Sequence, residues 1–423
     1  MNINEATLRY VREHENEDVR QLALQGSKDA ETDLTMALQQ IAGRQTAKRK
    51  LPSWAEEDGI IYPPHLNMEQ CSSEQTARYK QQLATSITPT SSKEGSSLFV
   101  DLTGGFGVDF YWLSQAYRER IYVEQSAELC QLAEHNFQAL SLRCTVCCCD
   151  TATYLTGMPH ASLVFLDPAR RNEQGGRTYG IADCSPNVLE LLPLLTAKAE
   201  RLMLKLSPML DWRKAVNDLN EQLKSTEHRV SQVHIVSVNN ECKELLLLID
   251  KEQNGKLRLC CVNNDSCFDT SYSLSENSPN GSDREFAADG LRVRTRRTNT
   301  GIEEHFLYEP NASVMKAGCF AELEAQFDVW QVAHNSHLFL SSDEIGDFPG
   351  RGFQILSISS MNKRELHQKL SSMESANISV RNFPLSADQL RKKLKLKDGG
   401  SVYIFATTIQ NGEHKLFICR KIS

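Results

Sequence analysis

Short apolar runs alternate with amphipathic stretches between residues 98 and 250, and this alternation predicts an α/β sheet. Each run has the length and the continuous apolar character of a buried strand. Between them, Leu129, Leu132 and Ala133 fall on one face of an expected helix. Apolar strands separated by helices are typical of a parallel sheet that is covered on both faces. The expected strands are residues 98–101, 120–124, 145–150, 162–167, 201–206, 232–238 and 244–250.

The last two of these strands are separated by only a short link. Because a parallel crossover needs a dozen residues or more, we expect these two strands to pair antiparallel. Before them, helices are expected around residues 188–195 and 212–223.

The regions on either side of this segment have different patterns. Residues 1–90 are mainly helical in pattern, and the sequence SSEQ at residues 72–75 is typical of a capping box before a helix over residues 73–83. Residues 253–289 are rich in turn signals, which indicates hairpins or an exposed connection. The end of the chain alternates strands with helices and predicts a small α+β module.

A glycine-rich turn follows the first expected strand, in the sequence DLTGGFG. Glycine lets the backbone bend sharply and approach a ligand, and the next helix offers its free N–H groups there. We expect this turn to surround a cationic or amino-acid-bearing group. The candidate residues are Asp101, Thr103, Gly104, Gly105, Phe106 and Gly107.

An acidic residue ends each of the first four expected strands. In such a sheet a ligand lies beyond the carboxyl ends of the strands, so the acids converge on one crevice. Glu124 suits a bidentate contact with ribose hydroxyls, and Asp150 can accept a hydrogen bond from the exocyclic amine of adenine. Asp167 faces the group to be modified. The alternative is that the glycines only form a turn and that the acids only keep the strand ends soluble.

From residue 98 to residue 250 the chain resembles a class I S-adenosylmethionine-dependent methyltransferase. DLTGGFG resembles the DLGCGTG turn of that superfamily, with Thr103 where its first glycine usually stands. Glu124 matches the ribose-binding acid, Asp150 the adenine-contacting acid, and Asp167 the first residue of the catalytic motif. The resemblance implies S-adenosylmethionine as the cofactor. A dehydrogenase is a poorer match, because the turn lacks the GxGxxG pattern.

The fourth strand ends in the sequence DPARR, residues 167–171. Enzymes that methylate exocyclic amines of bases usually carry an aromatic residue in the fourth place of this motif, where it stacks on the flipped base, and this chain has Arg170 there. The uracil C5-methyltransferases need a nucleophilic cysteine after the fifth strand, where this chain has Ser207. Both reactions are therefore disfavoured.

Ribose 2′-O-methylation fits better. Lys80, Asp167, Lys205 and Glu244 follow the order of the Lys-Asp-Lys-Glu tetrad of ribosomal RNA 2′-O-methyltransferases, which the chain resembles here. A lysine beside carboxylates can accept or steer the proton of a hydroxyl. Those enzymes do not carry the DPARR sequence, however. The alternative is that Lys80 and Glu244 are solvated charges, whereas Lys205 lies within an apolar strand and needs a partner.

Two arginines follow the strand-end aspartate. Arg170 and Arg171 could bind a phosphate of the substrate. Equally, they could anchor the loop that follows them, residues 172–180, whose glycine pair suggests a movable flap.

Composition and charge limit the remaining possibilities. The net charge of −7 counts against a nucleic-acid partner, but basic clusters lie at residues 48–50, 292–297 and 391–397. Each could follow a phosphate backbone, although the last could also be the solvated face of a helix. No apolar stretch is long enough for a membrane span and no signal peptide is recognised, so we expect a cytoplasmic protein.

The cysteines indicate a reducing compartment. Thirteen cysteines are present, and three of them are adjacent at residues 147–149, where they cannot all pair with one another. Cys144 and Cys147 could be half of a zinc site, but no second pair accompanies them, so we expect no metal.

The C-terminal sequence completes the resemblance. The alternating strands and helices from residue 331, with RNFP at residues 381–384, resemble the THUMP-like domain of a bacterial methyltransferase family. Residues 290–330 resemble its small ferredoxin-like insert. True THUMP domains bind RNA, which implies RNA as a partner, although the module could instead be a structural or dimerisation unit.

These observations predict a Rossmann-like, seven-stranded methyltransferase sheet with an N-terminal helical region and C-terminal α+β modules. The expected bounds are 1–90 for the helical region, 91–255 for the methyltransferase domain, 285–330 for the ferredoxin-like domain and 331–423 for the THUMP-like domain. The expected function is methylation of RNA, tRNA or rRNA, at a ribose 2′-hydroxyl. The alternatives are a small-molecule O-methyltransferase and a non-catalytic RNA-binding protein that keeps the fold.

Overall fold

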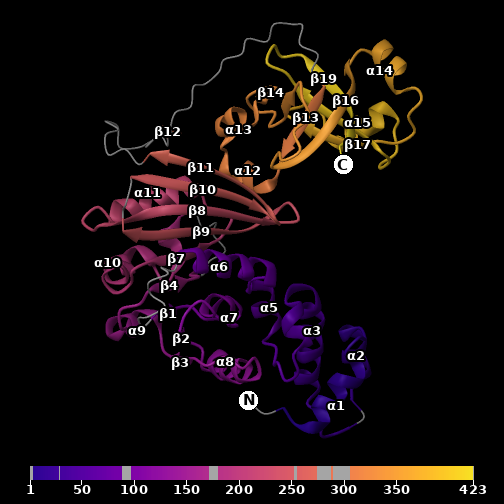
Figure 1. Cartoon of the computed structure of the whole chain (residues 1–423). Coiled ribbons are helices and arrows are strands. Elements are labelled where there is room, and N and C mark those ends of the chain that lie inside the picture. Colours follow the sequence, from indigo (N-terminus) through magenta and orange to yellow (C-terminus); the bar gives the residue numbers. More distant parts are fainter. Residues whose placement is uncertain are drawn as a thin grey trace. The chain divides into compact units, whose positions relative to one another are not determined.

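The computed structural model divides into two compact units (Figure 1). Unit 1 comprises Met1–His234 and Lys243–Leu257, and unit 2 comprises Ile235–Cys242 and Arg258–Ser423. The structure describes residues 3–27, 29–87, 97–170, 180–251, 255–273, 287–288 and 305–422.

Six helices precede the first strand in the described part of the chain. They are α1 (Glu5–His14), α2 (Val19–Gln25), α3 (Leu34–Lys50), α4 (Pro52–Glu56), α5 (His65–Gln70) and α6 (Glu74–Ile87). Val11, Leu22 and Ile41 form a small apolar core between the first three helices. The cap of α6 differs from the expected one: the Ser73 hydroxyl accepts the hydrogen bond from Thr76 N–H, which leaves Ser72 for other contacts.

The central sheet carries the predicted strands in a mixed arrangement. Its strands are β1 (Leu98–Asp101), β2 (Glu119–Glu124), β3 (Thr145–Cys148), β4 (Leu163–Leu166), β7 (Leu202–Leu206), β8 (His228–Val238), β9 (Glu241–Lys251), β10 (Lys256–Asn263), β11 (Ser266–Ser273) and β12 (Ala287–Ala288). Their order in the sheet is β12-β11-β10-β8-β9-β7-β4-β1-β2-β3.

The parallel part of the sheet agrees with the prediction. β1, β2, β3, β4 and β7 run parallel, and β9 is antiparallel to β7 and lies next to β8 in the sheet. β1 lies between β2 and β4, so the strand order reverses at its carboxyl end, where an α/β sheet binds its ligand. The fold class is confirmed, and β10 and β11 extend the sheet beyond the expected strands because alternate residues such as Leu257 and Leu259 are fully buried.

Helices connect the parallel strands. They are α7 (Val108–Ser114), α8 (Ala127–Ala139), α9 (Thr151–Gly157), α10 (Val188–Lys198) and α11 (Trp212–Gln222). Ser126 caps α8, because its hydroxyl accepts a hydrogen bond from Leu129 N–H. A short strand β5 (Ala169–Arg170) follows β4 and pairs antiparallel with β6 (Cys184–Ser185), which follows a short 3₁₀ turn, η2 (Ile181–Asp183).

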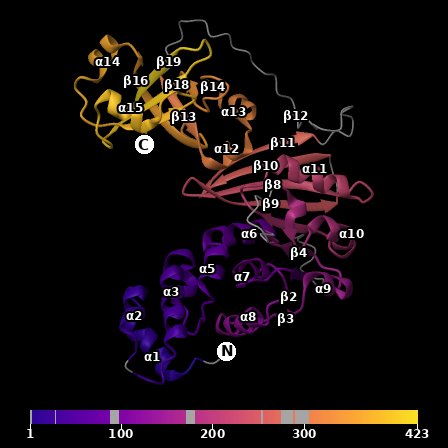
Figure 2. The same ribbon diagram turned by 180° about the vertical axis from the view of Figure 1, so that it is seen from behind.

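Unit 2 contains a second sheet, visible from behind in Figure 2. Its elements are β13 (Phe306–Pro310), α12 (Ala312–Ala317), α13 (Phe320–Phe327), β14 (Trp330–Gln331), β15 (Phe339–Ser341), β16 (Gly350–Ser360), α14 (Lys363–Leu370), β17 (Asn377–Arg381), α15 (Ala387–Leu394), β18 (Val402–Thr408) and β19 (His414–Lys421). The strand order is β14-β15-β13-β16-β19-β18-β17. Leu370 of α14 and Leu390 of α15 pack on Ile404 and Ile418, so both helices cover this sheet. The predicted strand–helix alternation after residue 350 is confirmed.

Candidate functional site

The glycine turn joins β1 to α7 and is closed tightly against β2. A Cβ atom at Gly104 would lie 2.1 Å from the ring of Tyr122, and the Tyr122 hydroxyl donates a hydrogen bond to the Gly105 carbonyl at 2.6 Å. Gly107 has a φ of 88° and is the N-cap residue of α7, and a Cβ atom there would lie 2.8 Å from Phe137. The turn therefore requires glycine at both Gly104 and Gly107, the first for close approach and the second for both close approach and backbone conformation.

We expect a Gly104→Ala substitution to lower the stability of unit 1 by about 1–3 kcal/mol, because the new methyl group overlaps the Tyr122 ring. Thermal unfolding measures the effect. Gly157→Ala is the matched control: no atom lies within 4 Å of its Cβ position, and stability should stay equal or rise. An unchanged melting temperature for Gly104→Ala would contradict the tight packing.

Thr103 stands where the methyltransferase turn usually has its first glycine, and its side chain has a contact that glycine could not make. Its hydroxyl accepts a hydrogen bond of 2.7 Å from the backbone N–H of Asp167, so it links the turn to the end of β4. Its own N–H donates to the Asp101 carboxylate at 2.9 Å. Burial raises the pKa of Asp101 well above its usual value, and this hydrogen bond only partly offsets the shift.

Glu124 ends β2 directly beside the turn. One carboxylate oxygen accepts a hydrogen bond from Gly105 N–H at 2.9 Å, and the other accepts one from Ser126 N–H at 2.8 Å. Two backbone donors thus fix the carboxylate at the carboxyl edge of the sheet, where the sequence predicts it.

The other two predicted cofactor residues lie in different surroundings. Asp150 follows β3, is exposed, and caps α9 by accepting a hydrogen bond from Thr153 N–H at 3.0 Å. The Phe106 ring is 4% exposed and packs edge-on against Trp54 at 5.1 Å, within an apolar cluster. A ligand in the crevice would therefore meet the backbone of Phe106 rather than its ring.

Lys80 of α6 is buried and fully paired. Its ammonium group donates to both carboxylate oxygens of Glu244 at 2.6 and 2.8 Å, and it lies 3.0 Å from Asp109. The Ser72 hydroxyl, which does not cap the helix, accepts a third hydrogen bond from Lys80 at 3.1 Å. Burial raises the pKa of Glu244, and the attraction to Lys80 only partly compensates.

Lys205 of β7 forms the other half of the same ionic network. Its ammonium group donates to Asp167 at 2.5 Å and lies 3.4 Å from Asp109. Burial disfavours the charged form of Lys205, but the carboxylates of Asp167 and Asp109 outweigh it and raise the pKa of the lysine. Burial is likewise outweighed at Asp109, whose pKa is lowered by Lys80 and Lys205.

The structure therefore brings the four predicted residues of the tetrad together and adds two that the sequence pattern does not reveal. Asp109 bridges the two lysines, and Ser72 donates to Asp109 at 2.7 Å. Asp109 has a detectable signal, since it is the one acidic residue in an otherwise apolar first turn of α7. Ser72 has none, because its sequence context indicates a helix cap.

Exposure separates the residues that could reach a substrate from those that could not. The side chains of Lys80 and Glu244 are 0% and 3% exposed, whereas those of Lys205 and Asp167 are 11% and 37% exposed. The network thus runs from a buried pair to an open pair at the end of β4.

Some predicted features fall wholly or partly outside the described residues. The backbone of Arg170 lies in β5, whereas Arg171, the flap at 172–179 and the basic cluster at 292–297 are outside the described part. None of the thirteen cysteines forms a disulfide in the part of the chain that the structure describes. Within the described residues, no group of His, Cys, Asp and Glu side chains is arranged to hold a metal, and no helix has the length and hydropathy to cross a membrane.

Comparisons with known proteins agree with the fold. A THUMP domain-like family model matches residues 350–421, and a ferredoxin-like domain model matches residues 306–349. The two models meet at residue 349/350, whereas the sequence pattern places that boundary at 330/331. No curated protein matches the chain.

Solved structures provide a second comparison. The crystal structure of a "putative methyltransferase" from Porphyromonas gingivalis W83 is 28% identical, and the match covers 100% of both chains with a TM-score of 0.80. TrmK from M. capricolum, solved with S-adenosyl-homocysteine, is 11% identical over 41% of this chain and 69% of its own, with a TM-score of 0.31. A "putative RNA methyltransferase" from Pyrococcus horikoshii is 14% identical over 49% of this chain and 96% of its own, with a TM-score of 0.34. The predicted resemblance, a methyltransferase fold followed by ferredoxin-like and THUMP-like domains, is confirmed.

Proposed function

We propose that the chain transfers a methyl group from S-adenosylmethionine to RNA, with a ribose 2′-hydroxyl as the acceptor. The observation that carries this proposal is the Lys205–Asp167 pair, which lies at the carboxyl end of β4 and is joined through Thr103 to the glycine turn. A cofactor site and a charged pair suited to a hydroxyl therefore share one edge of the sheet.

The residues at this edge fit S-adenosylmethionine. Because position 104 is glycine, the turn packs directly against Tyr122. The Glu124 carboxylate lies beside the turn, where it can accept hydrogen bonds from the hydroxyls of a ribose. Asp150, exposed at the end of β3, offers an acceptor for the adenine amine. The sulfonium of the cofactor supplies an already activated methyl group, so the protein has mainly to position the acceptor.

The charges assign separate tasks to the two residues of the open pair. Lys205 stays protonated at neutral pH because its pKa is raised, so it holds the acceptor oxygen and stabilises the negative charge that develops there. Asp167 is the more exposed partner and takes the hydroxyl proton as the oxygen–carbon bond forms and the sulfur–carbon bond breaks. Asp109 and Lys80 act as positioning residues, because Asp109 pairs with Lys205 from the buried side and is itself paired with Lys80.

Unit 2 supports RNA as the substrate class. Lys392, Lys393, Lys395 and Lys397 are exposed on and just after α15, while Leu390 beneath them is buried. Arg391 of the same cluster pairs with Asp388 and Asp398. Exposed lysines on a THUMP-like domain suit the phosphates of RNA.

Transfer of labelled methyl groups tests the proposal directly. Purified protein and labelled S-adenosylmethionine are incubated with total RNA or with a metabolite extract, and the labelled RNA nucleosides are identified by mass spectrometry. Label in a 2′-O-methylated nucleoside supports the proposal. Label only in the extract favours a small-molecule O-methyltransferase, and no label in either favours a non-catalytic RNA-binding protein.

We expect Glu124→Ala to weaken S-adenosylmethionine binding by roughly 10- to 100-fold, because a charged bidentate contact to the ribose is lost. Isothermal titration calorimetry measures the dissociation constant. Glu128→Ala removes an exposed acid of the neighbouring helix α8 and should leave the affinity unchanged. Equal dissociation constants for Glu124→Ala and the unmodified chain would remove Glu124 from the cofactor site.

A further inference from the structure

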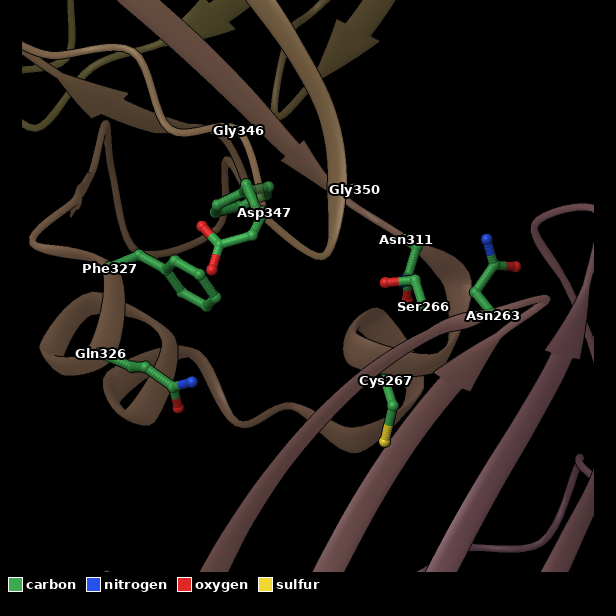
Figure 3. Close-up of a pocket in the computed structure, with 10 residues that line it drawn as sticks. Asn263, Ser266, Cys267, Asn311, Gln326, Phe327, Gly346, Asp347 and Gly350 are labelled. Carbon is green, nitrogen blue, oxygen red and sulfur yellow. The ribbon is translucent and has the colours of Figure 1, made fainter. Parts of the chain in front are cut away.

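A hollow of about 470 Å³ lies within unit 2 (Figure 3), whereas the residues of the ionic network belong to unit 1. It is bounded by the β10–β11 hairpin, the end of α13 and the loop at 346–350. Its volume falls within the range of small-ligand sites, about 300–1,000 Å³. Asp347 and Phe327 lie on one side of it, and Asn311, Ser266 and Asn263 lie on the other.

The lining of the hollow has hydrogen-bonding groups but no positive charge. No Lys, Arg or His side chain contributes to it among the described residues, and its one ionisable oxygen acid is Asp347. A phosphate or another anion would be repelled by this carboxylate. A neutral ligand with N–H donors would be attracted, because the carboxylate is exposed and no hydrogen bond or ion pair of its side chain is seen in the described structure.

The walls of the hollow are held rigidly. The Phe327 ring contacts Phe348 at 5.6 Å and Phe268 at 6.0 Å, so that one partly exposed aromatic surface faces the hollow. The loop that carries Asp347 is fixed at both ends, since Ile345 N–H donates to the Tyr308 hydroxyl at 2.7 Å and Pro349 accepts from Asn311 N–H at 3.0 Å. Both features are thus set before a ligand arrives, which lowers the cost of binding.

From this combination we propose that the hollow binds one unstacked guanine base of the RNA. The base would stack on Phe327, and the Asp347 carboxylate would accept two hydrogen bonds, from the N1–H and the 2-amino group of guanine. Unpaired bases are commonly recognised by an aromatic ring and by contacts to the Watson–Crick edge. The inference that the base belongs to RNA rests on the proposed function, whereas the stacking and hydrogen bonds that the hollow offers to guanine do not.

Fluorescence anisotropy with short RNAs tests the proposal on the full chain. The probes are labelled U-rich hexanucleotides with one central guanosine, inosine or adenosine. We expect the guanosine probe to bind about tenfold more tightly than the adenosine probe, with inosine between them because it keeps N1–H and lacks the 2-amino group. Equal affinities for all three probes would overturn the proposal.

Two variants assign the preference to Asp347. In Asp347→Asn the guanosine preference should disappear, whereas Glu344→Gln, the same charge change at an exposed acid of the same segment, should keep it. If Asp347 only repelled phosphates, Asp347→Asn would instead tighten all three probes equally, which would refute the proposed contact.

Cys267 gives a measurement that needs no variant. It is an exposed thiol in the lining, and a hydrogen bond from Cys260 lowers its pKa to about 7, so it reacts readily with iodoacetamide. The guanosine probe should slow alkylation of Cys267 more than the adenosine probe does, while exposed Cys148 of β3 should be alkylated equally with both. Equal rates at Cys267 with both probes would count against the proposal.

The two proposals fail separately. RNA methylation by a chain that shows no guanine preference would refute the pocket alone. A guanine preference that depends on Asp347, in a chain that transfers no methyl group, would refute the proposed activity alone.

Discussion

Replacing Asp167 by alanine should abolish methyl transfer and leave S-adenosylmethionine bound. The carboxylate is the most exposed member of the ionic network and contacts Lys205 at 2.5 Å, so its loss removes the proton acceptor and releases the lysine. General-base groups typically contribute about 10²–10⁴-fold to a rate. The cofactor turn should persist, because it is the backbone N–H of Asp167, not the side chain, that donates to Thr103.

Two measurements on the same variant separate chemistry from binding. Label transfer from S-adenosylmethionine to RNA gives the rate, and calorimetry gives the dissociation constant of the cofactor. Asp218→Ala is the control, since it removes a partly exposed acid of α11 that pairs only with Lys214 in the described structure. Normal turnover by Asp167→Ala would exclude Asp167 from the reaction.

Replacing Lys80 by methionine should cause the largest loss of stability, about 3–5 kcal/mol. The ammonium group is fully buried and neutralises Glu244 and Asp109. Without it, two carboxylates remain in an apolar interior with only Lys205 nearby. Lys214→Met is the control, because an exposed ion pair of this kind contributes about 0–1 kcal/mol.

Urea unfolding followed by tryptophan fluorescence measures this loss, since three of the four tryptophans lie in unit 1. The double variant Lys80→Met/Glu244→Leu should recover part of the stability, because it removes the charge that Lys80 neutralised. The free energy of unfolding of Lys80→Met could instead lie within about 1 kcal/mol of that of the unmodified chain, which is the upper limit for a surface ion pair. That result would show that the buried pair does not stabilise the fold.

The loss of stability caused by Lys80→Met should depend on pH. The pKa of Asp109 is lowered in the folded chain, so its pairing stabilises the fold above the ordinary pKa of an aspartate and is lost as the pH falls through the lowered value. Glu244, whose pKa is raised, takes up its proton earlier on acidification. The difference between Lys80→Met and the unmodified chain should therefore be largest near neutral pH and shrink in acid.

The sequence predicts the strands and the convergence of their acids because both depend on local patterns. Parallel strands bring their carboxyl ends to one edge, so the pattern alone is enough to place Asp167 near Lys205. It is not enough for Asp109 and Ser72, since their contact depends on how α6 packs beside α7, far apart in the sequence. Packing also decides the orientation of Phe106, whose ring has an apolar partner in Trp54.

The added strands of the sheet have a similar cause. Residues 256–273 carry many turn-forming and polar residues, which mask the alternating apolar positions that β10 and β11 bury. The hollow of unit 2 has no signal in the sequence at all, because Asn263, Phe327 and Asp347 come from three separate segments with no shared motif.

The ionic network also has an electrostatic consequence at long range. Three carboxylates accompany two ammonium groups, so this edge of the sheet presents no surplus of positive potential to an approaching polyanion. Encounter with RNA would then be governed by lysines elsewhere, such as those around α15, and its rate should fall steeply with ionic strength. The methyl-transfer step, in contrast, takes place beside charges that are paired with one another, and its rate should be nearly insensitive to salt.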